Sequence, residues 1–383
     1  MCFRGAAYEF KDLMDFSMHG DRTIVQFLVQ TVPFLGARIQ GLHRLGRGAL
    51  ENPKAFALKG ALVMLAGLAL YLRYHDDERY KQLEDWDKNT YYHFWIGDRH
   101  FRIPKPFEVG ALFGTIPERI TEYILSESPD AEKRLLKNLR WVLAETLNFG
   151  SVQIAGVPVP APQTVAPILE QWANVDSFTQ RPIVGEHLER LRPEAQYDAW
   201  TSASARALGE IFGLSPKRIE HLIRGYFGTM GAYALGVSDV VTRRLMDYPN
   251  PPARRLEDMP VIRSFYRGSG EPRYTRYATE FYELMEEIDR TYATVQNYRR
   301  LGDWQKARDL RIAEAETQKY RRMMLSTRER IERINRNMRT IYESRTLSPE
   351  EKARQLDALV AQKNAIFREA MRAIESDRAR SSQ

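Results

Sequence analysis

The sequence predicts a mainly α-helical protein: a helical domain with an apolar helical hairpin and one small β-hairpin, followed by a long-helix, coiled-coil-like C-terminal region. Two uncharged stretches, 23–37 and 60–72, lie near the start of a chain that is 28% charged. A run of aromatic and β-branched residues broken by Gly97-Asp98 favours a β-hairpin over 91–103. Beyond residue 273 proline and glycine almost disappear, which favours long helices.

Composition places the chain among folded proteins. With 383 residues, 43% of them hydrophobic, it is long enough to bury substantial cores. The formal net charge of +7 permits contact with nucleic acid or anionic lipid but requires neither. Cys2 is the single cysteine, so an intrachain disulfide is excluded, and no Cys/His cluster has the spacing of a zinc site.

The two uncharged stretches predict two apolar helices joined by a basic connector. The connector has a net charge of +4, because Arg38, Arg44, Arg47, Lys54 and Lys59 face only Glu51. The residues that we expect to contact a membrane are the large apolar ones of both helices: Ile24, Phe27, Leu28, Phe34, Leu35, Leu62, Leu65, Leu68 and Leu72.

The length of the second apolar stretch is marginal for a membrane span. A bilayer core of about 30 Å needs about 20 apolar residues of helix, and shorter stretches are more often buried or interfacial. If the ammonium group of Lys59 snorkels toward water, residues 55–72 give about 27 Å of helix, which just reaches across. Spanning, lying in, and avoiding the bilayer all remain open at this point.

Local signals predict the helices and connectors in the middle of the chain. Proline at 104 and 106 predicts an extended segment before a helix from Phe107, which Pro117 kinks or restarts. Further signals predict a helix from Ser128-Pro129, an extended proline-rich connector over 157–167, and a helix capped by Ser215 that ends near Arg224-Gly225.

The chain divides into four parts on this basis. We predict an apolar helical hairpin region at 1–80, a helical domain at 81–248, a linker at 249–273 and long charged helices at 274–383. The last part should contain helices over 274–301, 303–344 and 349–377, the third with a capping box of Ser348 and Glu351.

Motifs of catalysis are missing from the sequence. It has no HExxH, Walker loop, GxSxG elbow or GxGxxG after a strand. The glycine-rich run at 225–236 follows a helix, which favours turns and close helix packing over a phosphate site. Asp98, His100 and Glu108 flank the β-hairpin but lack a third group to orient an acid/base pair. We therefore expect a protein that is not an enzyme and that uses no metal or cofactor.

Arginines suggest an anionic partner in two places. We take Arg38, Arg44 and Arg47 in the connector, and Arg333 and Arg336 in the C-terminal helices, as the candidate contacts. Glutamates at 329, 332 and 343 are interleaved with the second group, which favours a solvated face with i,i+4 pairs over a continuous DNA-binding stripe. Both interpretations remain open, the solvated face being favoured.

Three longer stretches resemble a known family: "FRIPKPFEVGALFGTIPERI" from 101, "FTQRPIVGEHLERLRPEAQYDAWTSASARALGEIFGLSP" from 178, and "IEHLIRGYFGTMGAYAL" from 219. Together they resemble the large polyvalent protein-associated helical domain of giant phage-encoded polypeptides, including internal virion (DNA-ejection) proteins of tailed phages. The resemblance covers roughly 8–245. Its motif residues are Ile103, Pro104, Lys105, Pro106, Phe107, Glu108, Arg181, Pro182, Ser215, Pro216, Arg224 and Gly225.

The resemblance implies a setting and no catalytic residues. It implies a structural protein stored in the virion interior and delivered into the host cell envelope with the genome. Its partners would be other virion proteins, the host membrane or DNA, and further copies of itself. We expect a fragment, a degraded prophage remnant or a separately encoded C-terminal module of such a polypeptide. Its apolar hairpin should be buried in the stored protein and released into lipid on delivery. The alternative is a soluble assembly or DNA-binding helical module.

Overall fold

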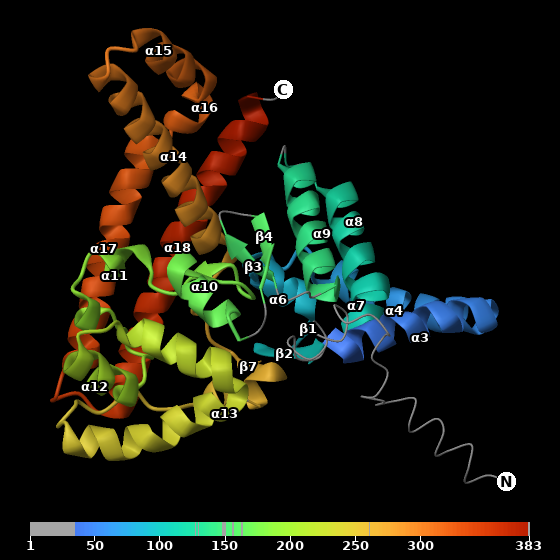
Figure 1. Ribbon diagram of the computed structural model, residues 1–383, viewed down its shortest axis with the longest axis horizontal. Coiled ribbons are helices and arrows are strands. Elements are labelled where there is room, and N and C mark those ends of the chain that lie inside the picture. Colours follow the sequence, from blue (N-terminus) through green and yellow to red (C-terminus); the bar gives the residue numbers. More distant parts are fainter. Residues whose placement is uncertain are drawn as a thin grey trace.

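The computed structural model describes residues 35–126, 128, 130–147, 151–154, 157–161, 164–259 and 261–381. These residues are mainly helical, with three small antiparallel sheets. The helices α3 and α4 project from one side of the molecule, and the long C-terminal helices lie on the opposite side (Figure 1). The mainly α fold with a small β-hairpin and a long-helix C-terminal region is as predicted.

The N-terminal part is a helical hairpin beside a small sheet. Helix α3 (Leu35–Glu51) and the apolar α4 (Pro53–Tyr74) are joined by Asn52, whose side chain accepts a hydrogen bond from the Ala55 amide. Short helices α5 (Glu78–Lys81) and α6 (Asp85–Thr90) lead into strands β1 (Tyr91–Ile96) and β2 (Arg99–Pro104). The β-hairpin therefore forms where the sequence predicts it.

This arrangement corrects the predicted basic connector. The residues assigned to it are largely helical, because they form α3 and the start of α4. Among the described residues, the apolar α4 packs against the basic α3. Within the first uncharged stretch, residues 23–34, including Ile24, Phe27, Leu28 and Phe34, lie outside the described residues.

The helices after the sheet begin near the predicted prolines. They are α7 (Phe107–Gly110), the π-helical turn η1 (Ala111–Thr115), α8 (Ile116–Leu125) and α9 (Ala131–Leu147). Pro117 lies in the first turn of α8, where its missing N–H costs no helical hydrogen bond. Thr115 and Ile116 keep right-handed helical φ and ψ, so the π-helical turn runs directly into α8, and Pro117 marks the junction between these two helical segments.

The proline-rich segment differs from its prediction. Residues Val157–Pro160 form β4, which pairs with β3 (Ser151–Ile154) in a two-stranded antiparallel sheet. Both strands are edges, and an edge strand tolerates proline. The predicted connector ends early as well, because α10 (Ala166–Ala173) begins with Pro167 in its first turn.

The next part of the chain contains α13, which is longer than predicted. Strands β5 (Val175–Asp176) and β6 (Arg181–Pro182), α11 (Glu186–Glu189) and the 3-10 turn η2 (Pro193–Ala195) precede α12 (Ala203–Phe212) and α13 (Pro216–Leu245). The predicted end at Arg224-Gly225 is wrong: Gly225 stays helical against Pro167, and the break falls at Gly228, whose φ is +54°. Ser215 takes the N-cap position, but its hydroxyl does not cap the helix.

The segment predicted as a linker contributes to the sheet. It holds the 3-10 turns η3 (Leu256–Asp258) and η4 (Ile262–Ser264), and strand β7 (Tyr266–Gly268). β7 pairs with β2, so the sheet order is β1-β2-β7. The sheet is thus completed by residues more than 160 positions downstream of β2.

The C-terminal helices form a bundle around the largest core. They are α14 (Arg276–Arg300), α15 (Trp304–Ala313), α16 (Ala315–Gln318), α17 (Arg321–Glu343) and α18 (Pro349–Ser381). Phe281, Met324, Ile331 and Phe367 are among the fully buried residues of this core. Ser348 and Glu351 form the predicted capping box of α18, with hydrogen bonds of 3.2 and 3.1 Å.

The predicted single helix over 303–344 is wrong, because the chain breaks between Ala313 and Arg321. The breaks let the Gln318 amide donate to the Ile288 carbonyl of α14 at 3.0 Å. They also place the Tyr320 ring in the core, with its hydroxyl donating to Asp377 of α18. The tertiary contacts of Gln318 and Tyr320 therefore set the boundaries of these helices, which local helix propensity does not predict.

Candidate functional site

Helix α4 is the candidate site, because one of its faces is apolar and open to solvent. Leu58, Leu62, Leu65 and Leu72 are 51–64% exposed. Their spacing of four, three and seven residues places them on one face of the helix. Leu68 is half-buried beside this face, and Leu35 begins α3. Three of the predicted membrane contacts thus share a single exposed surface.

The opposite face of α4 fixes the helix to the protein. Gly60 and Gly67 are buried there, and a Cβ atom at Gly67 would lie 2.9 Å from the Tyr92 ring. The rings of Phe56 and Phe113 meet edge to face at 5.5 Å. Small residues therefore allow η1 and β1 to approach α4 closely. This packing covers one face only, so the prediction of an arm buried in the folded protein is wrong for the other face.

Length and composition give α4 the properties of a membrane-active helix. Within the described part of the chain it is the one helix long and apolar enough to cross a membrane, and only 17% of its apolar window is buried. A core helix of the same composition would be mostly buried. The exposed leucine face therefore distinguishes α4 from a core helix.

Cations bracket the leucine face. Lys54 and Lys59 are exposed near the start of α4, and Arg73 is exposed at its end. On α3, Arg47 forms an ion pair of 3.8 Å with Glu51 and Arg44 is half-buried, whereas the side chain of Arg38 is outside the described set. Apolar residues flanked by Lys and Arg are the pattern of helices that lie in the surface of an anionic membrane.

Beneath α4 lies a buried network of charged side chains that sequence reasoning missed. The Lys105 ammonium donates to Glu118 at 2.5 Å and to the Lys88 carbonyl at 2.9 Å. Burial lowers the pKa of Lys105 to about 8 and that of Lys88 to about 7, and it raises the pKa of the Glu118 carboxyl. Of these residues, the sequence analysis named only Lys105, because it belongs to the motif at 103–108.

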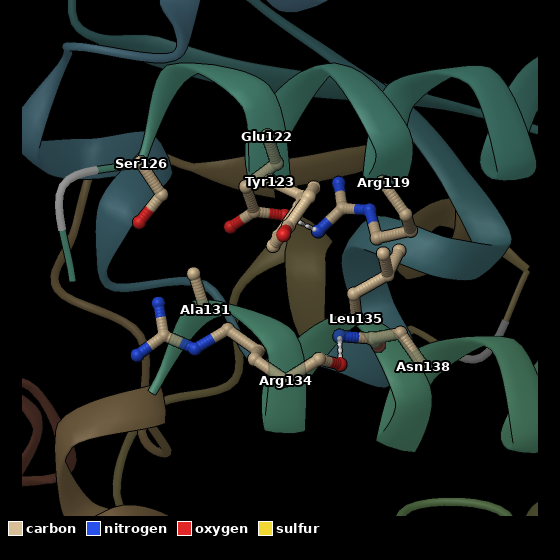
Figure 2. A pocket seen from close by; sticks show the side chains of 8 residues that line it. All are labelled: Arg119, Glu122, Tyr123, Ser126, Ala131, Arg134, Leu135 and Asn138. Atoms are coloured by element: carbon tan, nitrogen blue, oxygen red, sulfur yellow. Dashed lines mark hydrogen bonds and ion pairs between the residues drawn. The ribbon is translucent and has the colours of Figure 1, made fainter. Parts of the chain in front are cut away.

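The same network reaches the gap between α8 and α9 (Figure 2). Arg119 is fully buried, pairs with Glu122 and donates to the Tyr80 hydroxyl at 3.2 Å. The pocket that these helices enclose has a volume of about 10 Å³. Such a volume holds about one water molecule, so the charges here act as structural pairs and not as a binding site for a substrate.

A second buried polar pair lies inside the β-hairpin. His93 Nε2 is 3.2 Å from the Asp87 carbonyl oxygen, so this nitrogen carries the proton of the neutral ring. His93 Nδ1 then accepts from His100 Nε2 at 2.9 Å. His100 stacks on Trp95 at 4.4 Å. The structure thus joins His100 to His93 and not to Asp98 or Glu108.

The remaining motif residues are spread over the fold. Ile103 is exposed on β2, and Glu108 lies against Gly41 of α3. Arg181 of β6 forms a 3.5 Å ion pair with Glu84 and stacks on Tyr274. The others lie at or beside element ends, namely Pro104, Pro106, Phe107, Pro182, Ser215 and Pro216, or within α13, where Gly225 meets Pro167 and Arg224 pairs with Glu220 at 2.6 Å. They do not converge on one pocket, so their role is to hold elements together.

Arg333 and Arg336 are exposed on α17 and make no ion pair with any residue that the structure describes. Arg322 and Arg330 are exposed on the same helix, with Glu329 between them. Their neighbours Arg328 and Arg339 instead bond to Asp289 and to the Ala195 carbonyl. A partly basic face therefore remains on α17, whereas no metal-binding group of His, Cys, Asp and Glu occurs within the described ranges.

Comparison with known protein families gives a match to part of the chain. Residues 77–262, just under half of the chain, match the family Large polyvalent protein associated domain 38. No curated protein and no solved structure matches the chain. The matched range starts after α4 and ends before β7, so it is shorter at its start than the predicted resemblance. The chain therefore carries a large polyvalent protein associated domain, a domain of phage polyvalent proteins, as its motifs indicate.

Proposed function

We propose that the chain is a non-enzymatic structural part of a phage polyvalent protein that acts in genome delivery across the host envelope. It would be stored in the virion interior as the C-terminal part of an internal virion protein. The domain family supports the phage setting. The exposed leucine face of α4, bracketed by cations, supports contact with the host membrane.

In this proposal α4 binds lipid while its other face stays on the protein. From Lys54 to Arg73 the helix is about 28 Å long, close to the thickness of a bilayer core. However, Gly60, Gly67 and Tyr71 remain packed on the protein, which suits a helix lying in the membrane surface. Insertion across the bilayer would require α4 to leave this packing.

Vesicle flotation of the full chain tests the proposal. We expect the protein to float with phosphatidylcholine vesicles that contain phosphatidylglycerol, and less with phosphatidylcholine alone. Leu65→Asp should lower the bound fraction about tenfold, because it places a carboxylate in the apolar contact. The matched control is Leu301→Asp, at an exposed leucine that directly follows the last turn of α14.

Charge provides a second arm of the same experiment. Replacing Lys54 and Lys59 by Gln should weaken binding to the anionic vesicles by roughly 30-fold in total, at about 1 kcal/mol per cation. Failure of the wild type to float, or equal flotation of Leu65→Asp and Leu301→Asp, would rule out the membrane contact.

The exposed arginines of α17 support one alternative, a soluble module that binds DNA. In that case duplex DNA should bind in fluorescence anisotropy with a salt-dependent affinity. Arg333→Gln with Arg336→Gln should weaken binding and reduce the salt slope by about one per lost phosphate contact. Binding that the double change leaves unaltered would remove these arginines from the contact.

A further inference from the structure

Five arginines lie close together around β7, and we call them the arginine cluster. They come from separate elements: Arg102 from β2, Arg181 from β6, Arg224 from α13, Arg263 from η4 and Arg267 from β7. Strand β2 pairs with β7, and the Arg102 guanidinium donates to the Arg263 carbonyl at 2.7 Å. The fold therefore gathers charges that lie far apart in the sequence.

The carboxylates of the cluster are too few to neutralise it. Three of the arginines pair with a carboxylate: Arg102 with Asp87, Arg181 with Glu84, and Arg224 with Glu220. Arg267 lies 3.9 Å from Asp87, which is already paired, and the nearby Glu257 pairs with Arg255 instead. Arg263 forms no ion pair with any residue that the structure describes. Five guanidinium groups thus face three carboxylates, which leaves a net charge of +2.

The two guanidinium groups without a close carboxylate can be reached from solvent. Arg263 is exposed, and the side chain of Arg267 is 30% exposed. Desolvation, followed by the charges of Arg224, Arg267 and Arg102, lowers the pKa of Arg263. Desolvation also lowers the pKa of Arg267, and the charges of Arg102 and Arg181 add to this effect. Arginine stays protonated in proteins, so the cluster holds repelling charges together.

A phosphate monoester has the charge and the geometry that would relieve this repulsion. It carries nearly two negative charges at neutral pH, which matches the net charge of the cluster. Its oxygens accept the parallel pairs of N–H bonds that a guanidinium group donates. An internal phosphodiester of a nucleic acid carries one charge and neutralises the cluster less completely.

Exposed aromatic rings beside the cluster favour a nucleotide over other phosphate monoesters. Phe265 lies between Arg263 and Arg267 in the chain and is 53% exposed. Tyr274 is 47% exposed and stacks on the Arg181 guanidinium at 3.9 Å. Aromatic side chains next to guanidinium groups are surfaces on which bases stack.

We propose that Arg263 and Arg267 bind the phosphate monoester of a nucleotide, either free or at the end of a nucleic-acid strand. Arg102 and Arg224 add positive potential behind them, and Phe265 contacts the base. The site is separate from α4 and from the arginines of α17, and it requires no lipid.

Calorimetric titration of the full chain at low ionic strength tests the site. The probes are thymidine 5′-monophosphate, thymidine, and oligo(dT) with and without a 5′-phosphate. We expect a phosphorylated probe to bind at least tenfold more tightly than the same probe without its phosphate. Binding of the mononucleotide assigns a free nucleotide, and binding of the phosphorylated strand alone assigns a strand end. No binding of either, or equal binding with and without the phosphate, would overturn the proposal.

Substitution of the two arginines assigns the binding to the cluster. Arg263→Gln with Arg267→Gln should weaken binding about 100-fold, at about tenfold for each guanidinium group lost. The matched control is Arg333→Gln with Arg336→Gln, which removes the same charge from α17 and should leave binding unchanged. Equal effects of the two double changes would show that the cluster is not the site.

Two further measurements separate a binding role from a structural one. Without ligand, Arg263→Gln should unfold at the same or a higher temperature than the wild type, because it removes one of several repelling charges. Arg263→Lys with Arg267→Lys keeps the charge but loses the paired donors, so it should bind about tenfold more weakly. A clear loss of thermal stability in Arg263→Gln, or full binding by the lysine variant, would contradict the site.

Discussion

Lys105 and Glu118 show what a buried charge does in this protein. Both side chains are at most 4% exposed, and their 2.5 Å ion pair joins the end of β2 to α8. Their desolvation is offset only while each has its partner, so the pair fixes the position of α8 relative to the hairpin. The loss of one partner should therefore cost far more than the loss of a surface charge.

We expect Lys105→Met to lower the free energy of unfolding by about 3–5 kcal/mol, because Glu118 is left buried with Arg119 as its nearest cation at 3.8 Å. Urea denaturation followed by circular dichroism measures this. The control is Arg290→Met, which breaks an exposed pair with Glu286 and should change stability by less than about 1 kcal/mol. Equal losses of stability in the two variants would show that the buried pair contributes no more than an exposed pair.

The buried pair of His93 and His100 makes stability depend on pH. Burial lowers the pKa of His93 to about 4 and that of His100 to about 2, below the ordinary value of 6.5. The unfolded chain therefore binds protons that the folded chain excludes. Stability should be complete above about pH 6.5 and should fall as the pH drops from 6.5 toward 4.

The expected loss from His93 is about 3 kcal/mol over that range. Thermal unfolding between pH 7 and pH 4.5 measures it. His93→Asn should flatten the pH dependence relative to the wild type, whereas His43→Asn, at an exposed residue of α3, should leave it unchanged. An identical slope in both variants would contradict the role of the buried pair.

At the scale of elements, the position of α4 depends on its glycines. Any side chain at Gly60 would collide with the Phe113 ring, whereas nothing lies within 4 Å of a Cβ added at Gly46 of α3. We expect Gly60→Ala to destabilise the protein by about 1–3 kcal/mol through overpacking. Gly46→Ala should be neutral or stabilising by up to about 1 kcal/mol, because alanine favours the helix.

Limited proteolysis of the α3–α4 region would report the same difference locally. Gly60→Ala should be cleaved faster there than the wild type, and Gly46→Ala should not. If both variants resist cleavage equally, α4 is held by contacts other than the close approach at Gly60.

Local signals predicted the elements whose causes are local. The hairpin turn at Gly97-Asp98 and the capping box of Ser348 and Glu351 depend on neighbouring residues, and both lie where they were predicted. The breaks around α16 depend on contacts of Gln318 and Tyr320 with other helices, so propensity misplaced them. The break in α13 falls at Gly228 and not at Gly225, although both are glycines, so local signals did not tell them apart. The same holds for the candidate site. Leu65 was identified from the sequence, but only the structure shows that its side of α4 is exposed to solvent.

At the scale of the whole molecule, the C-terminal helices pack onto the family domain. The Arg276 amide donates to the Gln82 carbonyl at 2.9 Å, and Arg378 pairs with Asp130 at 2.7 Å. Tyr197, Ala199 and Trp200 of the matched region are part of the core of the C-terminal bundle. The matched range 77–262 is thus covered on one side by helices beyond its end.

Removal of residues 274–383 should therefore prevent the rest of the chain from folding stably. The exposed core surface would favour aggregation or a state that binds the dye ANS. Size-exclusion chromatography and thermal unfolding of the 1–273 fragment measure this, and coexpression of residues 274–383 should restore solubility. A monodisperse fragment with a cooperative transition would show that the two parts fold independently.

The pairing of β2 with β7 also sets an order of events during synthesis on the ribosome. The Arg102 amide donates to the Phe265 carbonyl at 2.9 Å, and Phe101 lies opposite Tyr266. At about 5–20 residues per second, roughly 10–30 s separate the emergence of the two strands. During that interval one edge of β2 has no strand partner and is open to pairing with other chains. The nascent chain thus has a period in which a chaperone that shields strand edges would raise the yield of folded protein.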